Sequence, residues 1–425
     1  MPLEMELDYC PRMHRIGLRL AAYRIRRRLV GRLRRVLRWE FWPPYAFYPP
    51  VIAYIVYLGV RFRSFTLFTA ANPAMAAGGF VGESKDEILG HLKNGHLKSG
   101  NLNNAGSALP CSTILRHGDP AQRVEQAKAF MQNHQLSFPA VLKPDAGQRG
   151  SGVVIVRSSQ QLQEYLGQVS FPTILQEYVP GKEFGVFYVR YPGDEHGRVF
   201  SVTEKRMPAV VGDGRRTLEE LILADNRAVC MADFYLRKNS QRVREVPFAG
   251  ESVQLVEIGT HCRGAIFLDG SKMITPALQE AIQGIAEGFD GFFFGRFDIR
   301  VPSTEDFMAG RNLKVIELNG VTSEATHIYD AGLGPFNAYR VLFQQWRIAF
   351  EIGQRNRDRG ARPTSGRELL RMVREYRRLA EGHPETLEPN GNDSVNGRGV
   401  PSNHRFQGHF LANKQTLPTF CKSPR

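Results

Sequence analysis

Two hydrophobic segments in the C-terminal half carry oxygen-bearing side chains that could bind a metal ion. Residues 292–301 read FFFGRFDIRV and residues 313–319 read LKVIELN, and both alternate in the manner of β-strands. A charged side chain in so apolar a strand is costly to bury unless it is paired or binds a metal. The three candidate ligands are Asp298, Glu317 and Asn319. Because Mg²⁺ prefers such oxygen ligands, the pattern predicts a magnesium site.

Strict alternation also predicts which side chains share a face with these ligands. It places Arg296 on the face of Asp298, and it places Leu313 and Val315 on the face of Glu317. Arg296 would then face the same anionic centre. A buried ion pair between Arg296 and a neighbouring acid is the structural alternative.

A glycine-rich loop joins two further predicted strands within residues 138–156, FPAVLKPDAGQRGSGVVIV. The first strand delivers Lys143, and a strand rather than a helix follows the loop, which excludes a Walker A loop and a dinucleotide fingerprint. A glycine loop between antiparallel strands can cover nucleotide phosphates and bind them through backbone N–H groups. Lys143 would add a positive charge for the same phosphates. Taken alone, the motif is better interpreted as a plain hairpin with a surface lysine.

Residues 174–189, ILQEYVPGKEFGVFYV, predict a strand, a short connector and a second strand. Glu177 and Glu183 flank the connector. A connector between two lobes can present backbone N–H and C=O groups to an adenine edge, with a carboxylate placed for the ribose hydroxyls. Taken singly, Glu183 is better interpreted as a surface carboxylate.

In this order, the lysine with its glycine loop, the EYVPGKEF connector, RFD and ELN resemble the ATP-binding core of the ATP-grasp superfamily across residues 118–350. Residues 205–222, KRMPAVVGDGRRTLEELI, resemble the loop-and-helix segment of the ligases related to cyanophycin synthetase and of the ATP-grasp glutathione-forming enzymes. As a whole, the chain also resembles D-alanine–D-alanine ligase. The resemblance implies an α+β fold whose two lobes clasp ATP. It also implies that ATP phosphorylates a carboxylate and that an amine or thiol attacks the acylphosphate, with release of ADP and phosphate.

The resemblance further implies a role for each matching residue in nucleotide binding. Lys143 corresponds to the phosphate-contacting lysine. The residues that correspond to the flap are Gly147, Gly150, Ser151 and Gly152. The backbone of Glu177 and Val179 would meet adenine, and Glu183 would bind the ribose.

Metal binding and catalysis are assigned in the same way. Asp298, Glu317 and Asn319 correspond to the ligands of Mg²⁺ or Mn²⁺, with Glu317 bridging two ions. Arg296 corresponds to the arginine that steadies the acylphosphate, and Lys205 would add a cation near the γ-phosphate. Metals and cations dominate such chemistry because phosphoryl transfer is mostly positioning and charge neutralisation.

The acceptor site is less clearly encoded. After ELN the chain reads GVTSEATHIYD, where many peptide-forming relatives carry a Pro-Gly turn. Thr260, His261 and Arg263 are candidates for binding an acidic substrate, with a structural loop as an equal alternative. The partners are thus a small-molecule or peptide carboxylate and an amine or thiol acceptor, neither of them named by the sequence.

Capping signals predict several helices around this core. Asp119-Pro120, Thr217 with Glu220, Thr275-Pro276 and Ser365 with Glu368 each mark a helix N-terminus. A stripe of aromatic residues predicts one long core-facing helix. Its members are Phe336, Tyr339, Phe343, Trp346 and Phe350.

The net charge of +14 belongs mainly to one N-terminal arm. Eleven arginines and no acid lie between Arg12 and Arg38, which leaves only +3 for the rest. Leu29, Leu33 and Leu37 interleave with them at near-helical spacing, as in a basic amphipathic helix on an anionic membrane surface. A solvated basic tail is the alternative. Nucleic acid is disfavoured because the remaining body is nearly neutral and has no base-stacking aromatic pattern.

Residues 41–60, FWPPYAFYPPVIAYIVYLGV, carry no charge and are long enough to span a membrane. Four prolines, however, leave only residues 51–60 as an uninterrupted helical run. The preceding arginines would also place everything downstream outside the cell, away from ATP. We therefore expect an interfacial or re-entrant anchor and a cytoplasmic protein at the inner membrane face, with a buried hydrophobic wedge as the alternative.

The expected organisation has four parts. Residues 1–62 form the basic arm and apolar segment, 63–117 a small N-terminal region, 118–380 the ATP-grasp domain with C-terminal helices, and 381–425 a disordered tail rich in Asn, Gly, Pro and Ser. The favoured function is an ATP-dependent ligase. A membrane-tethered nucleotide-binding protein that has lost ligation is the alternative.

Overall fold

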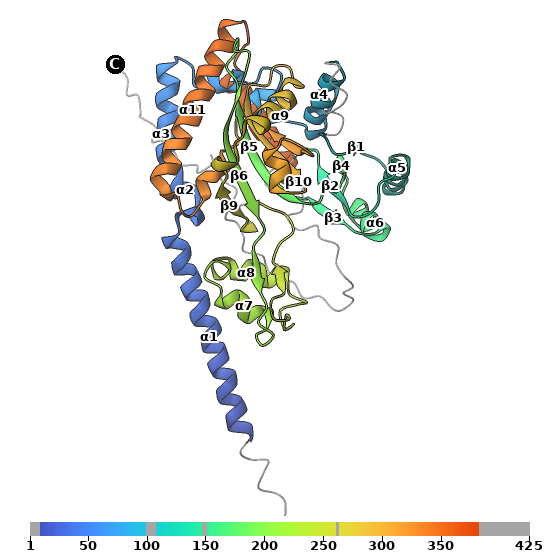
Figure 1. Ribbon diagram of the computed structural model, residues 1–425, viewed down its shortest axis with the longest axis vertical. Helices are drawn as coiled ribbons and strands as arrows, with labels where there is room; N and C mark the ends of the chain where they lie inside the picture. Colours follow the sequence, from blue (N-terminus) through green and yellow to red (C-terminus); the bar gives the residue numbers. More distant parts are fainter. Residues whose placement is uncertain (1–8, 99–107, 147–150, 261–262, 382–425) are drawn as a thin grey trace, which may run out of the picture.

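The computed structural model describes residues 9–98, 108–146, 151–260 and 263–381. Its centre is formed by two antiparallel sheets with helices packed around them, and the predicted α+β fold class is confirmed (Figure 1). Apart from Glu381, the predicted disordered tail lies outside the described residues.

The first sheet contains four antiparallel strands in the order β1-β4-β2-β3. The strands are β1 (Ser112–Leu115), β2 (Ala140–Pro144), β3 (Val154–Val156) and β4 (Thr173–Glu177). Helices α5 (Pro120–Asn133) and α6 (Ser159–Gln168) share an apolar core with it. The predicted cap of α5 is confirmed, since the Asp119 carboxylate accepts a hydrogen bond from the Gln122 N–H.

The second sheet contains five antiparallel strands in the order β11-β10-β5-β6-β9. The strands are β5 (Lys182–Val189), β6 (Arg198–Arg206), β9 (Ile266–Asp269), β10 (Phe294–Val301) and β11 (Lys314–Asn319). One face of this sheet is apolar and packs against α4 (Lys85–Lys98), α9 (Pro276–Glu287) and α10 (Thr304–Met308). The predicted Thr275 cap of α9 is present. The opposite face carries the charged residues of the candidate site.

A β-bulge changes the predicted faces of β11. Asp298 pairs with Glu317, but the next residue, Ile299, pairs with Val315, so Ile316 is the extra residue of the ladder. The bulge reverses the alternation beyond this point, and Val315 and Leu313 both join the apolar core. The prediction that these two residues share a face with Glu317 is therefore wrong.

A long C-terminal helix, α11 (Gly334–Asp358), packs against α3 (Pro49–Arg61) and the short 3₁₀ helix η2 (Leu67–Ala70). Phe350 is fully buried in this core, and Tyr339, Phe343 and Trp346 pack against it, as predicted. Phe336 is 87% exposed, so its predicted core position is wrong. It lies in the first turn, before Ala338, the first buried residue of α11.

Helix α12 (Gly366–Glu381) follows, and the Ser365 hydroxyl accepts a hydrogen bond from the Glu368 N–H, as predicted.

A small subdomain is inserted between β6 and β9. It consists of β7 (Ala209–Val211), α7 (Leu218–Ala224), the 3₁₀ helix η4 (Ala228–Met231), α8 (Ala232–Lys238) and β8 (Ser252–Gln254), and it has its own apolar core. The predicted capping box of Thr217 and Glu220 opens α7. The N-terminal helix α1 (Tyr9–Leu37) lies along α7 and η4, as Figure 1 shows.

The uncharged segment 41–60 forms α2 (Pro44–Phe47) and most of α3. Phe47, Val51 and Leu58 are buried in the core shared with α11. Searched over the described residues, the chain has no helix with the length and apolarity needed to cross a bilayer. The buried-wedge alternative therefore describes one side of this segment, and its other side is exposed.

Candidate active site

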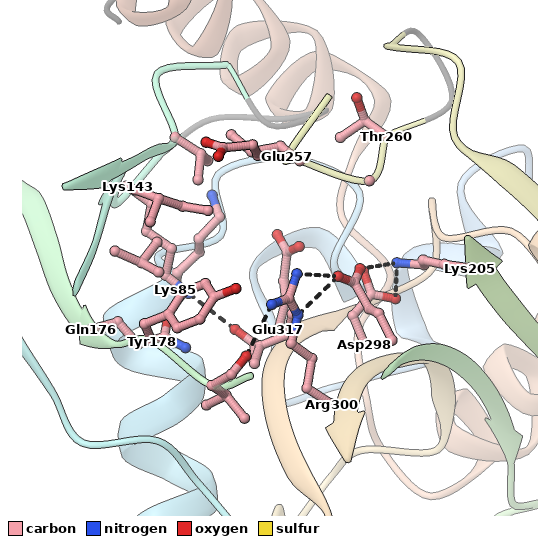
Figure 2. Close-up of a pocket in the computed structure, with 18 of the residues that line it drawn as sticks. Lys85, Lys143, Gln176, Tyr178, Lys205, Glu257, Thr260, Asp298, Arg300 and Glu317 are labelled. Atoms are coloured by element: carbon pink, nitrogen blue, oxygen red, sulfur yellow. Dashed lines mark hydrogen bonds and ion pairs between the residues drawn. The ribbon is translucent and has the colours of Figure 1, made fainter. Parts of the chain in front are cut away.

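A cleft with a cavity volume of about 150 Å³ opens between the two sheets. Its walls are formed by β2 and β3, by the β4–β5 connector and by the charged face of the second sheet (Figure 2). Eight of the residues proposed from the sequence for nucleotide binding, metal binding or catalysis line this cleft. They are Lys143, Ser151, Glu177, Val179, Glu183, Lys205, Asp298 and Glu317.

The β4–β5 connector joins the two sheets, because β4 belongs to the first and β5 to the second. The Glu177 N–H donates to the Cys111 carbonyl at 2.8 Å. The Val179 carbonyl accepts from an Arg300 terminal nitrogen at 2.9 Å, and the Arg300 guanidinium also lies over the Tyr178 ring. The connector is thus tied to β10, and among the described residues nothing accepts a hydrogen bond from the Val179 N–H. That amide is therefore available as a hydrogen-bond donor to a ligand in the cleft.

The charged face of the second sheet carries a continuous row of buried ion pairs. Lys205 Nζ lies 3.0 Å from Glu183 Oε1 and 3.1 Å from Asp298 Oδ1. Arg296 Nε donates to Asp298 Oδ1 at 2.9 Å. Arg300 binds the second Glu183 oxygen through Nε at 3.1 Å and through a terminal nitrogen at 3.0 Å. Each carboxylate therefore lies between two cations.

These contacts shift the pKa values of Asp298 and Lys205. Burial raises the pKa of Asp298, but Arg296 and Lys205 together outweigh burial and hold the pKa well below its usual value. Burial lowers the pKa of Lys205, and the Asp298 and Glu183 carboxylates more than offset this, so that its pKa is raised. The buried Arg296–Asp298 pair proposed as a structural alternative is thus present.

Glu317 is the direct neighbour of Asp298 across the β10–β11 ladder. Its carboxylate makes no ion pair or hydrogen bond with the residues that the structure describes. Lys143 Nζ donates to the carbonyl of Ile316, the bulged residue, at 3.0 Å. Burial lowers the pKa of Lys143 to about 8, although the nearby Glu317 carboxylate acts in the opposite direction. The bulge therefore brings the lysine and this free carboxylate to the same end of the cleft.

The donor chemistry of this end fits a divalent cation such as Mg²⁺. Asp298 and Glu317 both line the cleft. Asn319 lies on the same face opposite Arg296, and its Nδ2 is buried without a hydrogen-bond partner among the described residues. Within this part of the chain no three His, Cys, Asp or Glu side chains converge as a metal site. A ligand set would therefore combine two carboxylates with amide and phosphate oxygens, the mixture that Mg²⁺ accepts.

The structure describes the two ends of the glycine loop, on either side of residues 147–150. As predicted, β2 and β3 on either side of it are antiparallel. Ser151 lines the cleft, and Gly152 has a positive φ of 69° with its carbonyl accepting from the Tyr165 hydroxyl at 2.8 Å. A Cβ at Gly152 would lie 2.7 Å from Pro144, so the turn needs glycine. Gly147 and Gly150 lie outside the described residues.

Residues 72–85, which the sequence did not assign to the site, also reach the cleft. Asn72 is fully buried, and its Nδ2 donates to the carbonyls of Gly78 at 3.0 Å and Phe294 at 2.8 Å. Its Oδ1 accepts from the N–H groups of Phe293 and Phe294, both at 2.9 Å. One asparagine thus holds the segment against the start of β10.

The end of this segment brings Lys85 into the cleft. The Asp145 carboxylate, at the base of the glycine loop, accepts hydrogen bonds from the Ser84 hydroxyl and the Asp86 N–H, both at 3.0 Å. Lys85 lines the cavity with Lys143, and Glu83 lies beside Glu317, where burial raises the Glu83 pKa to about 7. Ser84 followed by Glu87 is a capping signal that predicts the start of α4, but not its position beside the loop.

The predicted acceptor residues are only partly brought to the site. Thr260 lines the cleft together with Glu257, whereas Arg263 is not among the lining residues. His261 lies outside the described residues.

Residues 115–190 match the RimK-like ATP-grasp domain family. They extend from the end of β1 through β5, and so include β2, the glycine loop and the connector. This match confirms the predicted resemblance to the ATP-grasp superfamily and supports the ATP-grasp fold.

Two cyanophycin synthetases are similar to part of the chain. The one from Trichormus variabilis is 35% identical over 122 residues, and the one from a Nostoc species is 30% identical over 122 residues. In both cases the match covers 28% of this chain and 12% of the relative. The matched region is thus a small fraction of those enzymes.

Solved structures of ligases show a weaker similarity. A bifunctional glutathione synthetase from Pasteurella multocida is 17% identical, with 63% of this chain and 38% of that chain covered and a TM-score of 0.33. A D-alanine–D-alanine ligase from Bacillus anthracis is 14% identical, with 65% and 69% covered and a TM-score of 0.35. Scores this low support no inference about the site or the reaction.

Proposed function

We propose that the protein is an ATP- and Mg²⁺-dependent ligase that activates a carboxylate as an acylphosphate and transfers the acyl group to an amine or thiol. The observation that carries the proposal is the meeting of Lys143, Lys205, Asp298 and Glu317 in one cleft between two sheets. The family match over residues 115–190 and the partial similarity to cyanophycin synthetases support the same reaction class.

The nucleotide would lie with its base at the connector and its phosphates toward β11. The Val179 N–H is positioned to donate to an adenine nitrogen, and Glu183 borders the adjoining part of the cleft as a candidate for the ribose hydroxyls. Lys143 and Lys85 would neutralise phosphate oxygens, and Ser151 would approach them from the glycine loop. Buried cations are effective in this role because little water screens them.

Asp298 and Glu317 would hold Mg²⁺, with Asn319 as a third oxygen donor after a rotation of its amide. Bound Mg²⁺ would supply neutralisation of the phosphate charge that builds up during transfer. Arg296 is fixed by Asp298 and donates to the Glu324 carbonyl at 3.0 Å, and would orient the acyl group. Lys205 remains protonated between two carboxylates and would stabilise negative charge on the transferred phosphoryl group.

The proposed reaction has two steps. A carboxylate oxygen of the substrate attacks the γ-phosphorus, the bond to the ADP oxygen breaks, and ADP leaves. The amine or thiol then attacks the acyl carbon, the C–O bond to phosphate breaks, and inorganic phosphate leaves together with one proton from the nucleophile. The chain's contribution is to hold both partners and to supply positive charge where negative charge develops.

Hydroxylamine trapping tests this proposal without knowledge of the acceptor. The full chain is incubated with ATP, Mg²⁺, hydroxylamine and a panel of carboxylates, with Glu317→Gln as the matched control. We expect ADP release that depends on one class of carboxylate, together with the matching hydroxamate. Carboxylate-independent ADP release with no hydroxamate from any acid would overturn the ligase proposal.

A further inference from the structure

Over residues 21–37, where its side chains are described, helix α1 contacts the rest of the protein mainly through arginines. Arg24 pairs with Glu219 at 2.6 Å, and Arg27 donates to the carbonyls of Leu223 at 2.6 Å and Ala224 at 2.9 Å. Gly31 lies so close to η4 that a Cβ would be 2.3 Å from the Val229 carbonyl oxygen. Arg34 also binds the side chain of Asn226. The positions 24, 27, 31 and 34 form one stripe of a helix, and this stripe faces the inserted subdomain.

Five large apolar residues between positions 21 and 37 of α1 form the opposite stripe and face away from the protein. They are Ile25, Leu29, Leu33, Val36 and Leu37, with exposures of 62%, 57%, 63%, 67% and 75%. A helix on the surface of a soluble domain normally has the reverse arrangement, with its apolar stripe toward the core. Five large apolar side chains in one exposed stripe indicate that something else covers this face.

Helix α3 extends the exposed apolar surface. Its outer residues Ile52, Val56, Tyr57 and Val60 are 41%, 49%, 52% and 64% exposed, while Val51 and Leu58 on its other side are buried. Figure 1 shows α1 and α3 following one another along the same edge of the molecule. We call this surface, formed by the nine exposed residues of α1 and α3, the apolar edge.

We propose that the apolar edge docks on an anionic membrane surface. Charge complementarity identifies this occupant. The exposed Arg26 and Arg32 flank the stripe of α1, and the exposed Arg61 and Arg63 lie at the end of α3. Over the described residues 9–82 the chain has one acid, Glu40, which is buried and paired with Arg38 and Arg227.

A bilayer with anionic headgroups satisfies both components of this surface. The apolar side chains would enter the boundary between headgroups and acyl chains, and the flanking arginines would contact lipid phosphates. A second copy of the chain would instead bring two rows of arginine together with no acid between them. The inner arginines, which the sequence alone would assign to lipid headgroups, serve to hold α1 on the protein. This inference does not depend on the proposed ligase activity.

Flotation of the full chain with vesicles tests the proposal. Vesicles of phosphatidylcholine with 30% phosphatidylserine should bind the protein, and pure phosphatidylcholine vesicles should bind it far less. Leu29→Ser with Leu33→Ser should weaken binding by about 100-fold or more, because two leucine side chains would no longer move from water into the apolar part of the bilayer. Arg26→Gln with Arg32→Gln should weaken it by about 20-fold and reduce its salt dependence.

The matched control is Leu370→Ser, which removes an apolar side chain of 57% exposure from α12. It should bind as the unaltered chain does, and circular dichroism should show all variants folded. Failure of the unaltered chain to bind anionic vesicles would overturn the proposal. So would unchanged binding of the double leucine variant. A lipid-free oligomer that the leucine changes dissociate, with no vesicle binding, would assign the apolar edge to a second copy instead.

Discussion

Asp298 and Glu317 are neighbours across one ladder, yet replacing them should have different effects on stability. Asp298→Asn removes the buried carboxylate that pairs with the partly buried Arg296, and with it one of the two partners of the buried Lys205. Removing one member of a buried ion pair typically costs about 3–5 kcal/mol. The Glu317 carboxylate has no ion pair or hydrogen bond among the described residues, so Glu317→Gln should cost less than about 1 kcal/mol.

Both variants should nevertheless lose Mg²⁺-dependent ATP turnover by about 100-fold or more, since each removes a proposed metal ligand. Stability is measured by urea unfolding followed by circular dichroism, without nucleotide or metal, and turnover by ADP release with saturating Mg²⁺. If Glu317→Gln lowers the unfolding midpoint as much as Asp298→Asn, Glu317 is a structural residue and our assignment of a free carboxylate fails. If both variants keep full turnover, the metal assignment itself is refuted.

Three further perturbations test other parts of the structure. Lys85→Ala should raise the KM for ATP by about tenfold with a smaller change in kcat. An unchanged KM would mean that Lys85 stabilises α4 but does not bind ATP. Burial raises the pKa of Glu83 from 4.5 to about 7. The free energy of unfolding should therefore fall by up to about 3 kcal/mol as the pH rises between these two pKa values, because the folded state favours the protonated carboxyl. Urea unfolding at pH 5 and pH 8 should show this loss in the unaltered chain and not in Glu83→Gln; an equal loss in both would mean that another group titrates. Leu58→Ala should destabilise the protein by about 2–5 kcal/mol, whereas Ile52→Ala on the outer side of α3 should cost less than about 0.5 kcal/mol. Equal effects at the two positions would contradict the one-sided burial of α3.

The strands and helix starts around the site could be predicted from the sequence, because each is determined by residues within a few positions of it. Alternation and capping residues lie within a few positions of the structure they determine, as with the Asp119 cap of α5 and the strands around Lys143. The sequence also placed Asp298 and Glu317 together as oxygen ligands on two strands, and in the structure they are neighbours across the β10–β11 ladder.

The bulge at Ile316 could not be predicted in this way. It is set by how two strands separated along the chain align with each other, and the one-strand pattern of LKVIELN contains no proline or glycine to mark it. The same limitation applies to residues 72–85. Asn72 and Lys85 belong to the site only because the chain folds back onto β10 and the glycine loop, which are distant in sequence. Amphipathicity likewise showed that α1 has two faces, but not which of them the protein itself would use.

Lys205 joins contacts that would otherwise form two separate groups. From the connector, hydrogen bonds and ion pairs run from the Val179 carbonyl to Arg300, then to Glu183 and Lys205. They continue through Asp298 and Arg296 to the Glu324 carbonyl, in the turn after β11. The nucleobase end and the acyl end of the proposed site are therefore connected before any ligand binds. A polar network whose members are all paired is rigid, and a preorganised site needs little rearrangement when charge develops. Without Lys205, Glu183 would keep Arg300 and Asp298 would keep Arg296, but the two halves of the site would no longer be held together by charge.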